Sequence, residues 1–194
     1  MSSSLSDIEL WNAAADGNRD AYSELFRRFY PRLHQYGMKI AADAEVVEDA
    51  IQELFLDLWQ KPTAQPLQSV QAYLLQAVKF KLYKHFRRQK QTSAGTFDED
   101  RLFELSPETL QISREEADER RQKIYAALAG LSPRQREIIY LKIYKGLSYE
   151  EVSEVMGMNY QVVRNLLYTA LKAFKKLYPV SYSFLTALIF SLCV

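Results

Sequence analysis

The sequence predicts an all-α protein: two small helical domains joined by a flexible acidic linker, the second containing a helix-turn-helix. Apolar residues recur at helical spacing along almost the whole chain, and no alternation of period two, the pattern of strands, is visible. The 194 residues include only 6 Gly and 6 Pro, few turn formers for a chain of many short strands. The 48% hydrophobic composition allows a buried core and argues against disorder over most of the length.

The first domain, residues 7–90, is expected to contain helices at about residues 7–16, 20–40, 43–60 and 69–90. Pro31 is expected to kink the second helix, because proline removes one backbone donor. Prolines within residues 61–66 separate the third helix from the fourth, for which Ser69 is a suitable N-cap. The third helix has the clearest pattern, with acidic residues outside an apolar stripe of Val47, Ile51, Leu54 and Leu58.

Residues 91–113 lose this periodicity and become rich in Thr, Ser, Gly, Asp and Glu, which predicts the flexible acidic linker. The second domain, residues 114–178, is expected to contain helices at about residues 114–129, 133–146, 149–156 and 159–178. Ser132 and Pro133 form a typical helix start, and Ser148 with Glu151 forms a capping box. Gly157 permits the left-handed backbone of a sharp turn between the last two helices.

A short helix, a glycine turn and a longer helix are typical of a helix-turn-helix, whose second helix enters the major groove. Arg pairs with guanine and Asn or Gln with adenine, and lysines farther along the helix suit phosphates. The outward residues of the last helix would be Tyr160, Gln161, Arg164 and Asn165, followed by Lys172, Lys175 and Lys176. Its buried set would be Val162, Val163, Leu166, Leu167, Ala170, Leu171 and Phe174. The alternative is an ordinary helical hairpin with a polar exposed face.

The formal net charge of +1 conceals alternating blocks of charge. Residues 61–90 carry 7 basic and no acidic side chains, whereas residues 1–60 carry 11 acidic and 5 basic ones. Local fields govern contacts with phosphates, so a nearly neutral chain can still bind nucleic acid. In the basic block, Lys79, Lys81, Lys84, His85, Arg87, Arg88 and Lys90 are interleaved with Phe80, Tyr83 and Phe86. Cations among aromatics suit a strand with unpaired bases; the alternative places Phe80 and Phe86 in the core and the cations on a solvated face.

Four segments, taken in order, resemble the sigma-70 family of RNA polymerase sigma factors in its short extracytoplasmic-function (ECF) form. The run Glu48-Asp49-Ala50-Ile51-Gln52-Glu53-Leu54-Phe55 is similar to the family's polymerase-binding signature. Tyr73-Leu74 followed by Arg87-Arg88 resembles the helix that melts and reads the −10 element. Leu131-Ser132-Pro133-Arg134-Gln135-Arg136-Glu137 resembles the opening of the −35-reading domain, and residues 147–171 resemble its helix-turn-helix.

This resemblance implies a transcription initiation factor that binds core RNA polymerase, promoter DNA and an anti-sigma factor. The implied polymerase-binding residues are Glu48, Asp49, Gln52, Glu53 and Phe55. The implied −10 residues are Tyr73, Lys79, Phe80, Lys84, Arg87 and Arg88, and the implied −35 residues are Tyr160, Gln161, Arg164, Asn165 and Lys172. The chain departs from the family pattern at Phe80, where many members carry an asparagine, so the usual −10 base contact is not implied.

Other functions remain to be weighed against this one. A DNA-binding regulator would use only the second domain, with the first as a sensor or dimerisation bundle. An enzyme is not expected, because His34 and His85 are isolated and neither a nucleophile motif nor a phosphate loop is present. The one cysteine, Cys193, excludes an internal disulfide and, with 2 His, gives no metal constellation, so no cofactor is expected. The N-terminus lacks the pattern of a secretory signal, which predicts a cytoplasmic location.

Residues 179–194 form an apolar tail that the family pattern does not include. No charged side chain occurs from Val180 to Val194, yet these residues are too few for an ordinary membrane span, which needs about 20. Exposed apolar segments mark partner or membrane sites. The tail is therefore expected either to fold back on the chain's own helices or to dock on a partner, such as an anti-sigma factor, or on a membrane face.

Overall fold

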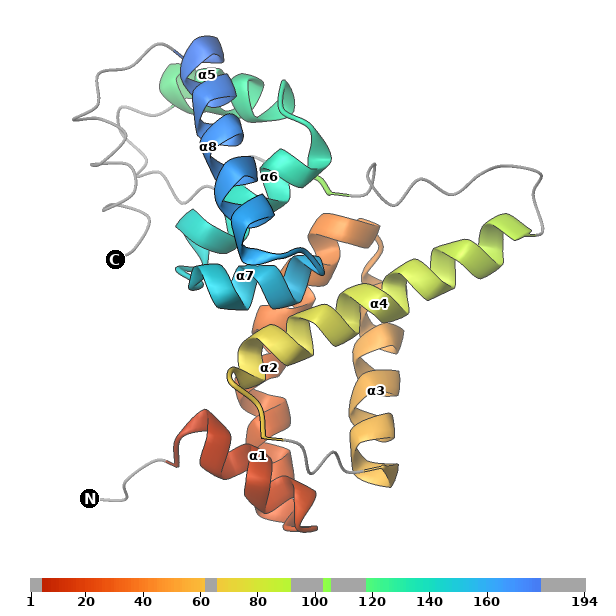
Figure 1. Ribbon diagram of the computed structural model, residues 1–194. Coiled ribbons are helices and arrows are strands. Elements are labelled where there is room, and N and C mark those ends of the chain that lie inside the picture. The colour runs from red at the N-terminus through yellow and green to blue at the C-terminus, as the bar shows by residue number, and fades with distance from the viewer. Residues whose placement is uncertain (1–4, 62–65, 92–102, 106–117, 179–194) are drawn as a thin grey trace. The chain divides into compact units, whose positions relative to one another are not determined.

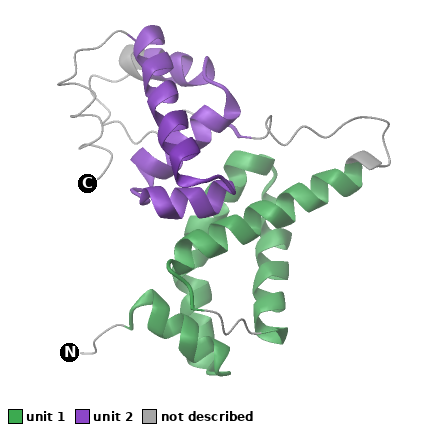
Figure 2. Cartoon of the chain, in the orientation of Figure 1, with its two compact units in different colours: residues 1–97 green, residues 98–194 purple. Residues whose placement is uncertain are grey.

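The computed structural model describes residues 5–61, 66–91, 103–105 and 118–178. These residues form eight α-helices and one five-residue π-helix, and none of them lies in a strand, so the all-α prediction is confirmed. The chain divides into two compact units, residues 1–97 and 98–194 (Figure 2). Within the described ranges, no helix combines the length and the apolar composition that crossing a bilayer requires.

The first unit contains α1 (Asp7–Ala15), α2 (Arg19–Ala41), α3 (Ala44–Gln60) and α4 (Val70–Gln91), close to the predicted bounds (Figure 1). Side-chain oxygens cap the helix starts, as expected for the orphan N–H groups of a first turn. Asn18 accepts hydrogen bonds from the backbone N–H groups of Asp20 and Ala21, and Ser69 accepts one from Ala72. The helix α2 is continuous through Pro31.

The core of the first unit forms where α2, α3 and α4 pack together with α1 against them. Its fully buried side chains come from helical stripes, among them Phe29 and Leu33 of α2, Val47 and Ile51 of α3, and Leu74, Val78 and Leu82 of α4. Gly37 of α2 lies against Val47, and a Cβ atom at Gly37 would be 2.6 Å from the Cγ1 atom of Val47. Leu58, expected in the buried stripe of α3, is half-buried.

The second unit contains α5 (Asp118–Ala129), α6 (Pro133–Ile139), the π-helix η3 (Tyr140–Tyr144), α7 (Tyr149–Met156) and α8 (Tyr160–Leu177). The single α-helix predicted for residues 133–146 is therefore wrong in its second half. The backbone N–H of Lys145 donates to the carbonyl of Tyr140 across five residues, the pattern of a π-turn. The buried ring of Tyr140 stacks on Tyr144 there, with centroids 5.2 Å apart.

The predicted flexible linker is corrected at three described residues, 103–105. Phe103 and Leu105 are buried, and the Phe103 ring lies 5.6 Å from that of Tyr140. The Phe103 carbonyl accepts a hydrogen bond from the Arg136 Nε at 3.0 Å. Burial of two apolar side chains anchors this stretch to the second unit. The rest of the linker and the tail at residues 179–194 lie outside the described residues, and the predicted domain limits at 7–90 and 114–178 stay predictions.

Candidate functional sites

The second unit contains the helix-turn-helix predicted from the sequence. Ser148 caps α7, where its Oγ accepts from the Glu151 N–H at 3.1 Å and the Glu151 carboxylate accepts from the Ser148 N–H at 2.7 Å. Gly157 ends α7 in the left-handed conformation, with φ of 63°. Asn159 then caps α8 by accepting from the N–H of Val162 at 2.9 Å. This local chemistry fixes the start of α8, the end that a recognition helix presents to DNA.

One face of α8, called the α8 face here, carries the residues predicted to contact duplex DNA. These predicted residues are all exposed: Tyr160, Gln161, Arg164, Asn165 and Lys172. The Gln161 Nε2 donates to the Asn165 Oδ1 at 3.2 Å, so the two amides lie side by side one turn apart. The opposite side of α8 is buried through Val163, Leu167, Ala170 and Phe174. Val162, expected in the core, is 44% exposed.

Tyr168 belongs to the α8 face, although the motif did not single it out. Its side chain is 66% exposed, the highest value among the exposed large hydrophobic and aromatic side chains of the residues that the structure describes. Tyr168 follows Arg164 by four residues and Gln161 by seven, so the three side chains share one face of the helix. Helical spacing alone was thus sufficient to identify it.

Aromatic rings support Arg164 from the start of the helix-turn-helix. The Arg164 guanidinium carbon lies 5.9 Å from the centroid of the Tyr160 ring, and Tyr160 meets Tyr149 edge-to-face at 5.6 Å. The Lys142 Nζ lies 4.6 Å from the centroid of Tyr149 and donates to the Leu147 carbonyl at 2.6 Å. A cation over an aromatic face is favoured electrostatically, so these contacts bias the direction of the Arg164 side chain.

In the first unit, the C-terminal half of α4 exposes a basic and aromatic surface. We define the α4 stripe as Phe80, Lys84, Arg87 and Arg88, all exposed. Phe80 is 60% exposed, so the alternative that placed it in the core is wrong. The Arg87 guanidinium carbon lies 6.0 Å from the Phe80 ring centroid. An exposed ring among cations is the combination that single-stranded nucleic acid needs for stacking and charge neutralisation.

Two residues expected at the −10 surface lie at its margin. Lys79 is half-buried, with its Nζ 5.6 Å from the Tyr83 ring centroid. Tyr73 is also half-buried, and its ring packs edge-to-face on the buried Trp11 at 5.2 Å. Part of Tyr73 thus serves the contact between α1 and α4.

The third candidate surface is on α3, where Asp49, Gln52 and Glu53 are exposed. Glu48 lies at its edge, half-buried, with its Oε1 3.9 Å from the Nε2 of His34. Leu56 is 53% exposed and follows Gln52 by four residues, so it adds an apolar side chain to this polar surface. We call Asp49, Gln52, Glu53 and Leu56 the α3 face.

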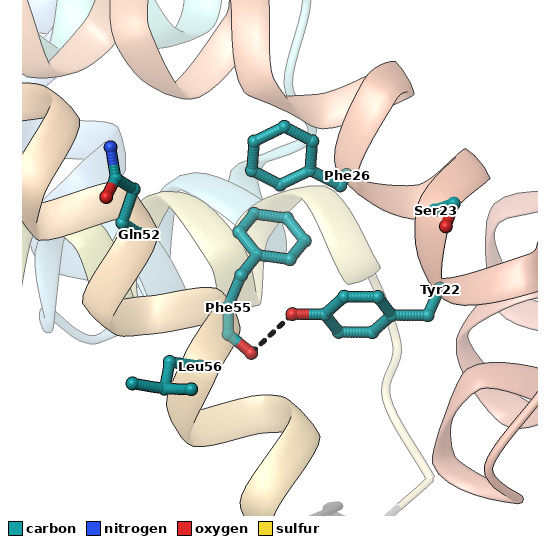
Figure 3. Close-up of a pocket in the computed structure, with 6 residues that line it drawn as sticks. All are labelled: Tyr22, Ser23, Phe26, Gln52, Phe55 and Leu56. Carbon is teal, nitrogen blue, oxygen red and sulfur yellow. Dashed lines mark hydrogen bonds between the residues drawn. The ribbon is translucent and has the colours of Figure 1, made fainter. Parts of the chain in front are cut away.

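The expected contact residue Phe55 is buried, with 2% exposure, because its ring packs against Phe26 at 4.9 Å and Tyr22 at 6.0 Å. The Tyr22 hydroxyl donates to the Phe55 carbonyl at 2.7 Å, and burial raises the pKa of that hydroxyl. Figure 3 shows these rings beside Gln52 and Leu56. An open hollow of about 430 Å³ is lined by Tyr22, Ser23, Phe26, Gln52, Phe55 and Leu56. Phe55 therefore shapes the wall of this hollow, and Leu56 provides the exposed apolar side chain.

Metal-ligating side chains do not gather at these surfaces. In the part of the chain that the structure describes, no group of three or more His, Cys, Asp and Glu side chains is placed to hold a metal ion. The three surfaces instead offer hydrogen-bonding, cationic and aromatic groups, which suit binding to macromolecules.

Two family models match the chain, one in each unit. The model of Sigma-70 region 2 matches residues 25–92, and the model of Sigma-70, region 4 matches residues 121–174. Together they cover more than half of the chain. The first match includes the α3 face and the α4 stripe, and the second includes the helix-turn-helix.

Relatives of similar length match across both units. The chain is 27% identical over 169 residues to the ECF RNA polymerase sigma factor SigK of Mycobacterium ulcerans, with coverage of 83% of this chain and 87% of that protein. It is 26% identical over 165 residues to the ECF RNA polymerase sigma factor SigX of Bacillus subtilis, covering 81% and 83%.

Two solved structures share the fold. The sigma factor RpoE, solved in complex with the anti-sigma factor NepR from Bartonella quintana, is 22% identical with a TM-score of 0.57, over 82% of this chain and 98% of that chain. CnrH, solved in complex with the cytosolic domain of CnrY, is 21% identical with a TM-score of 0.59, over 88% and 96%.

Proposed function

The chain belongs to the sigma-70 family of RNA polymerase sigma factors, in its ECF form, and we propose which of its surfaces performs each step of promoter recognition. As a sigma factor it directs RNA polymerase to promoters. This role needs no catalytic group of its own, because RNA synthesis is the reaction of the polymerase. We propose that the protein acts in the cytoplasm, because a sigma factor works on promoter DNA together with RNA polymerase.

The α3 face is proposed to dock on core RNA polymerase, with Glu48 at its edge. Its exposed carboxylates and amide surround one apolar side chain, Leu56, and the adjacent hollow is lined by aromatic rings. A small apolar centre with a polar rim is the usual anatomy of a protein–protein interface. Phe55 is buried and is proposed to contribute to this interface indirectly, because its ring packs against those of Tyr22 and Phe26.

The α4 stripe is proposed to capture the separated −10 strand. Phe80 offers its exposed ring to an unpaired base, while Lys84, Arg87 and Arg88 face the phosphates. The Phe80 side chain has neither a hydrogen-bond donor nor an acceptor, so it favours stacking over base-edge hydrogen bonds at this point of the strand. Lys79 and Tyr73 are assigned the margin of this surface, where their half-buried side chains lie.

The α8 face is proposed to read the −35 duplex. Arg164, Gln161 and Asn165 have the donor and acceptor groups that discriminate bases in the major groove, and Lys172 is placed for a phosphate. Two weak contacts on one polymerase-bound chain reinforce each other, because the first raises the effective concentration of the second. The proposed regulator is an anti-sigma factor, in line with the complex in which RpoE was solved.

The observation that carries the proposal is the presence in one unit of an acidic α3 face and a basic, aromatic α4 stripe. A regulator using only its helix-turn-helix needs neither. We expect Gln52→Ala combined with Glu53→Lys to weaken core-polymerase binding in competition with another sigma factor, while the first unit stays folded. Glu45→Lys, a charge reversal at the exposed first turn of the same helix, is the matched control and should retain most of the affinity. Equal affinity of the double variant and the wild type would remove the assignment of the α3 face.

A further inference from the structure

Lys81 lies in the basic run of α4 but does not join the α4 stripe. Its Nζ is 2.6 Å from the Asp57 Oδ2 and 3.1 Å from the Glu53 Oε1, both on α3. Its side chain is only 11% exposed, whereas those of Glu53 and Asp57 are 57% and 60% exposed. The Lys81 side chain of α4 is thus directed toward α3, the helix that carries the α3 face.

The electrostatics agree with this geometry. Burial alone would lower the pKa of Lys81, but the hydrogen bonds to Asp57 and Glu53 outweigh it and the pKa lies above its ordinary value. The hydrogen bond from Lys81 lowers the pKa of Asp57. Lys81 is therefore charged at neutral pH and is occupied by two carboxylates, so it has little charge to offer to a phosphate.

We propose that Lys81 is a positioning residue for polymerase binding, which holds the Glu53 carboxylate in place on the α3 face. This inference rests on the assignment of the α3 face to core polymerase made above. A free glutamate on a helix surface samples several rotamers, and fixing such a side chain on binding has an entropic cost. The contact uses one oxygen of Glu53, and a carboxylate accepts hydrogen bonds at both, so Glu53 can still accept from a partner.

Asp57 gives Lys81 its second anchor. It lies one turn beyond Glu53 on α3 and makes the shorter contact, so it keeps the ammonium near Glu53. A purely structural bridge between α3 and α4 would affect stability alone. A positioning role also predicts that substituting Lys81 changes the affinity for polymerase only when Glu53 is present. This dependence can be measured.

The test is a double-mutant cycle on the full chain, read as affinity for purified core polymerase. Lys81→Met keeps most of the aliphatic stem and removes the charge; it should weaken binding about three- to fivefold, the upper scale of an ion pair with exposed partners. The same substitution should have no further effect when Glu53→Gln is already present. Lys81→Arg should restore most of the affinity. Lys84→Met removes one charge from the same helix and should reduce core affinity less than Lys81→Met, but reduce −10 strand affinity more.

The outcomes separate this inference from the proposed function. If Glu53→Gln leaves core affinity unchanged, Glu53 makes no contact that Lys81 could position and the inference is refuted, whereas the α3 face as a whole is decided by Gln52→Ala combined with Glu53→Lys. If Glu53→Gln weakens binding but Lys81→Met has no effect, or the same effect in both backgrounds, the α3 face stands and the positioning role of Lys81 is refuted. Should Lys81→Met lose its thermal unfolding transition, Lys81→Gln takes its place in the cycle, with the same expected result.

Discussion

Gly37 allows α2 and α3 to approach closely. We expect the effect of Gly37→Ala on the free energy of unfolding to be destabilising with valine at position 47 and stabilising with alanine there. A Cβ atom at Gly37 would be 2.6 Å from the Cγ1 and 3.2 Å from the Cγ2 of Val47, which is fully buried. Valine has one strongly preferred rotamer in a helix, so it cannot turn away. Overpacking of this kind costs about 1–3 kcal/mol, and alanine regains about 1 kcal/mol over glycine in a helix. We therefore expect Gly37→Ala to lower the free energy of unfolding by about 1 kcal/mol.

In the Val47→Ala background both clashing atoms are absent, and only the Cβ at 3.5 Å, an ordinary contact, remains. There Gly37→Ala should instead raise the free energy of unfolding, by up to about 1 kcal/mol from helix propensity. Urea denaturation followed by tryptophan fluorescence measures this, because both tryptophans, Trp11 and Trp59, belong to the first unit. An equal effect of Gly37→Ala in the two backgrounds would refute the close contact.

Three further predictions concern the second unit and the tail. Arg164→Ala should lose about 1–3 kcal/mol of discrimination at one −35 base pair, whereas Lys172→Ala should weaken all duplexes about equally and reduce the salt dependence; a sequence-neutral Arg164→Ala would place α8 in the wrong register. Burial, with a contribution from Glu151, raises the pKa of Glu154, so its ionisation opposes folding. Glu154→Gln should therefore raise the melting temperature of the second unit, measured by calorimetry at neutral pH. This gain should vanish below about pH 4, because the glutamate is then protonated in both the folded and the unfolded state. A gain that persists below pH 4 would contradict this prediction. Truncation after Tyr178 should preserve promoter recognition and change solubility, inhibition or membrane association; loss of the thermal unfolding transition would show instead that the tail is core.

The helices and the helix-turn-helix were predictable because their signals are local. Ser148 with Glu151 marks the start of α7, and Gly157 marks its end, before any tertiary contact is considered. The same reasoning, applied as spacing on a helix, predicts the α8 face and shows that Tyr168 belongs to it.

Features that depend on packing between elements were not predictable. Phe55 follows Ile51 by four residues, so spacing places it beside the buried stripe of α3. The partners that it meets there, the rings of Tyr22 and Phe26 on α2, could not be predicted from spacing. Spacing likewise places Lys81 beside the buried Val78, three residues before it, but it could not predict the two carboxylates that α3 brings to Lys81.

The burial of Phe103 has the same origin. Its segment has no helical period, and its environment, which includes Tyr140, exists only once the second unit has folded and η3 has formed. Composition alone therefore predicted a flexible linker at residues 103–105, where the structure shows two apolar side chains buried in the second unit.

The central claim is that one chain brings core polymerase, a −10 strand and a −35 duplex together through three separate surfaces. Run-off transcription with purified core polymerase on a library of random promoter sequences, followed by mapping of the start sites, tests it most directly. We expect initiation only when the chain is present, at sites preceded by two conserved elements near −10 and −35. Arg164→Ala should relax the upstream element alone, and Phe80→Ala should affect the downstream element alone. Initiation independent of the chain, or a single upstream element with no −10 preference, would contradict the account.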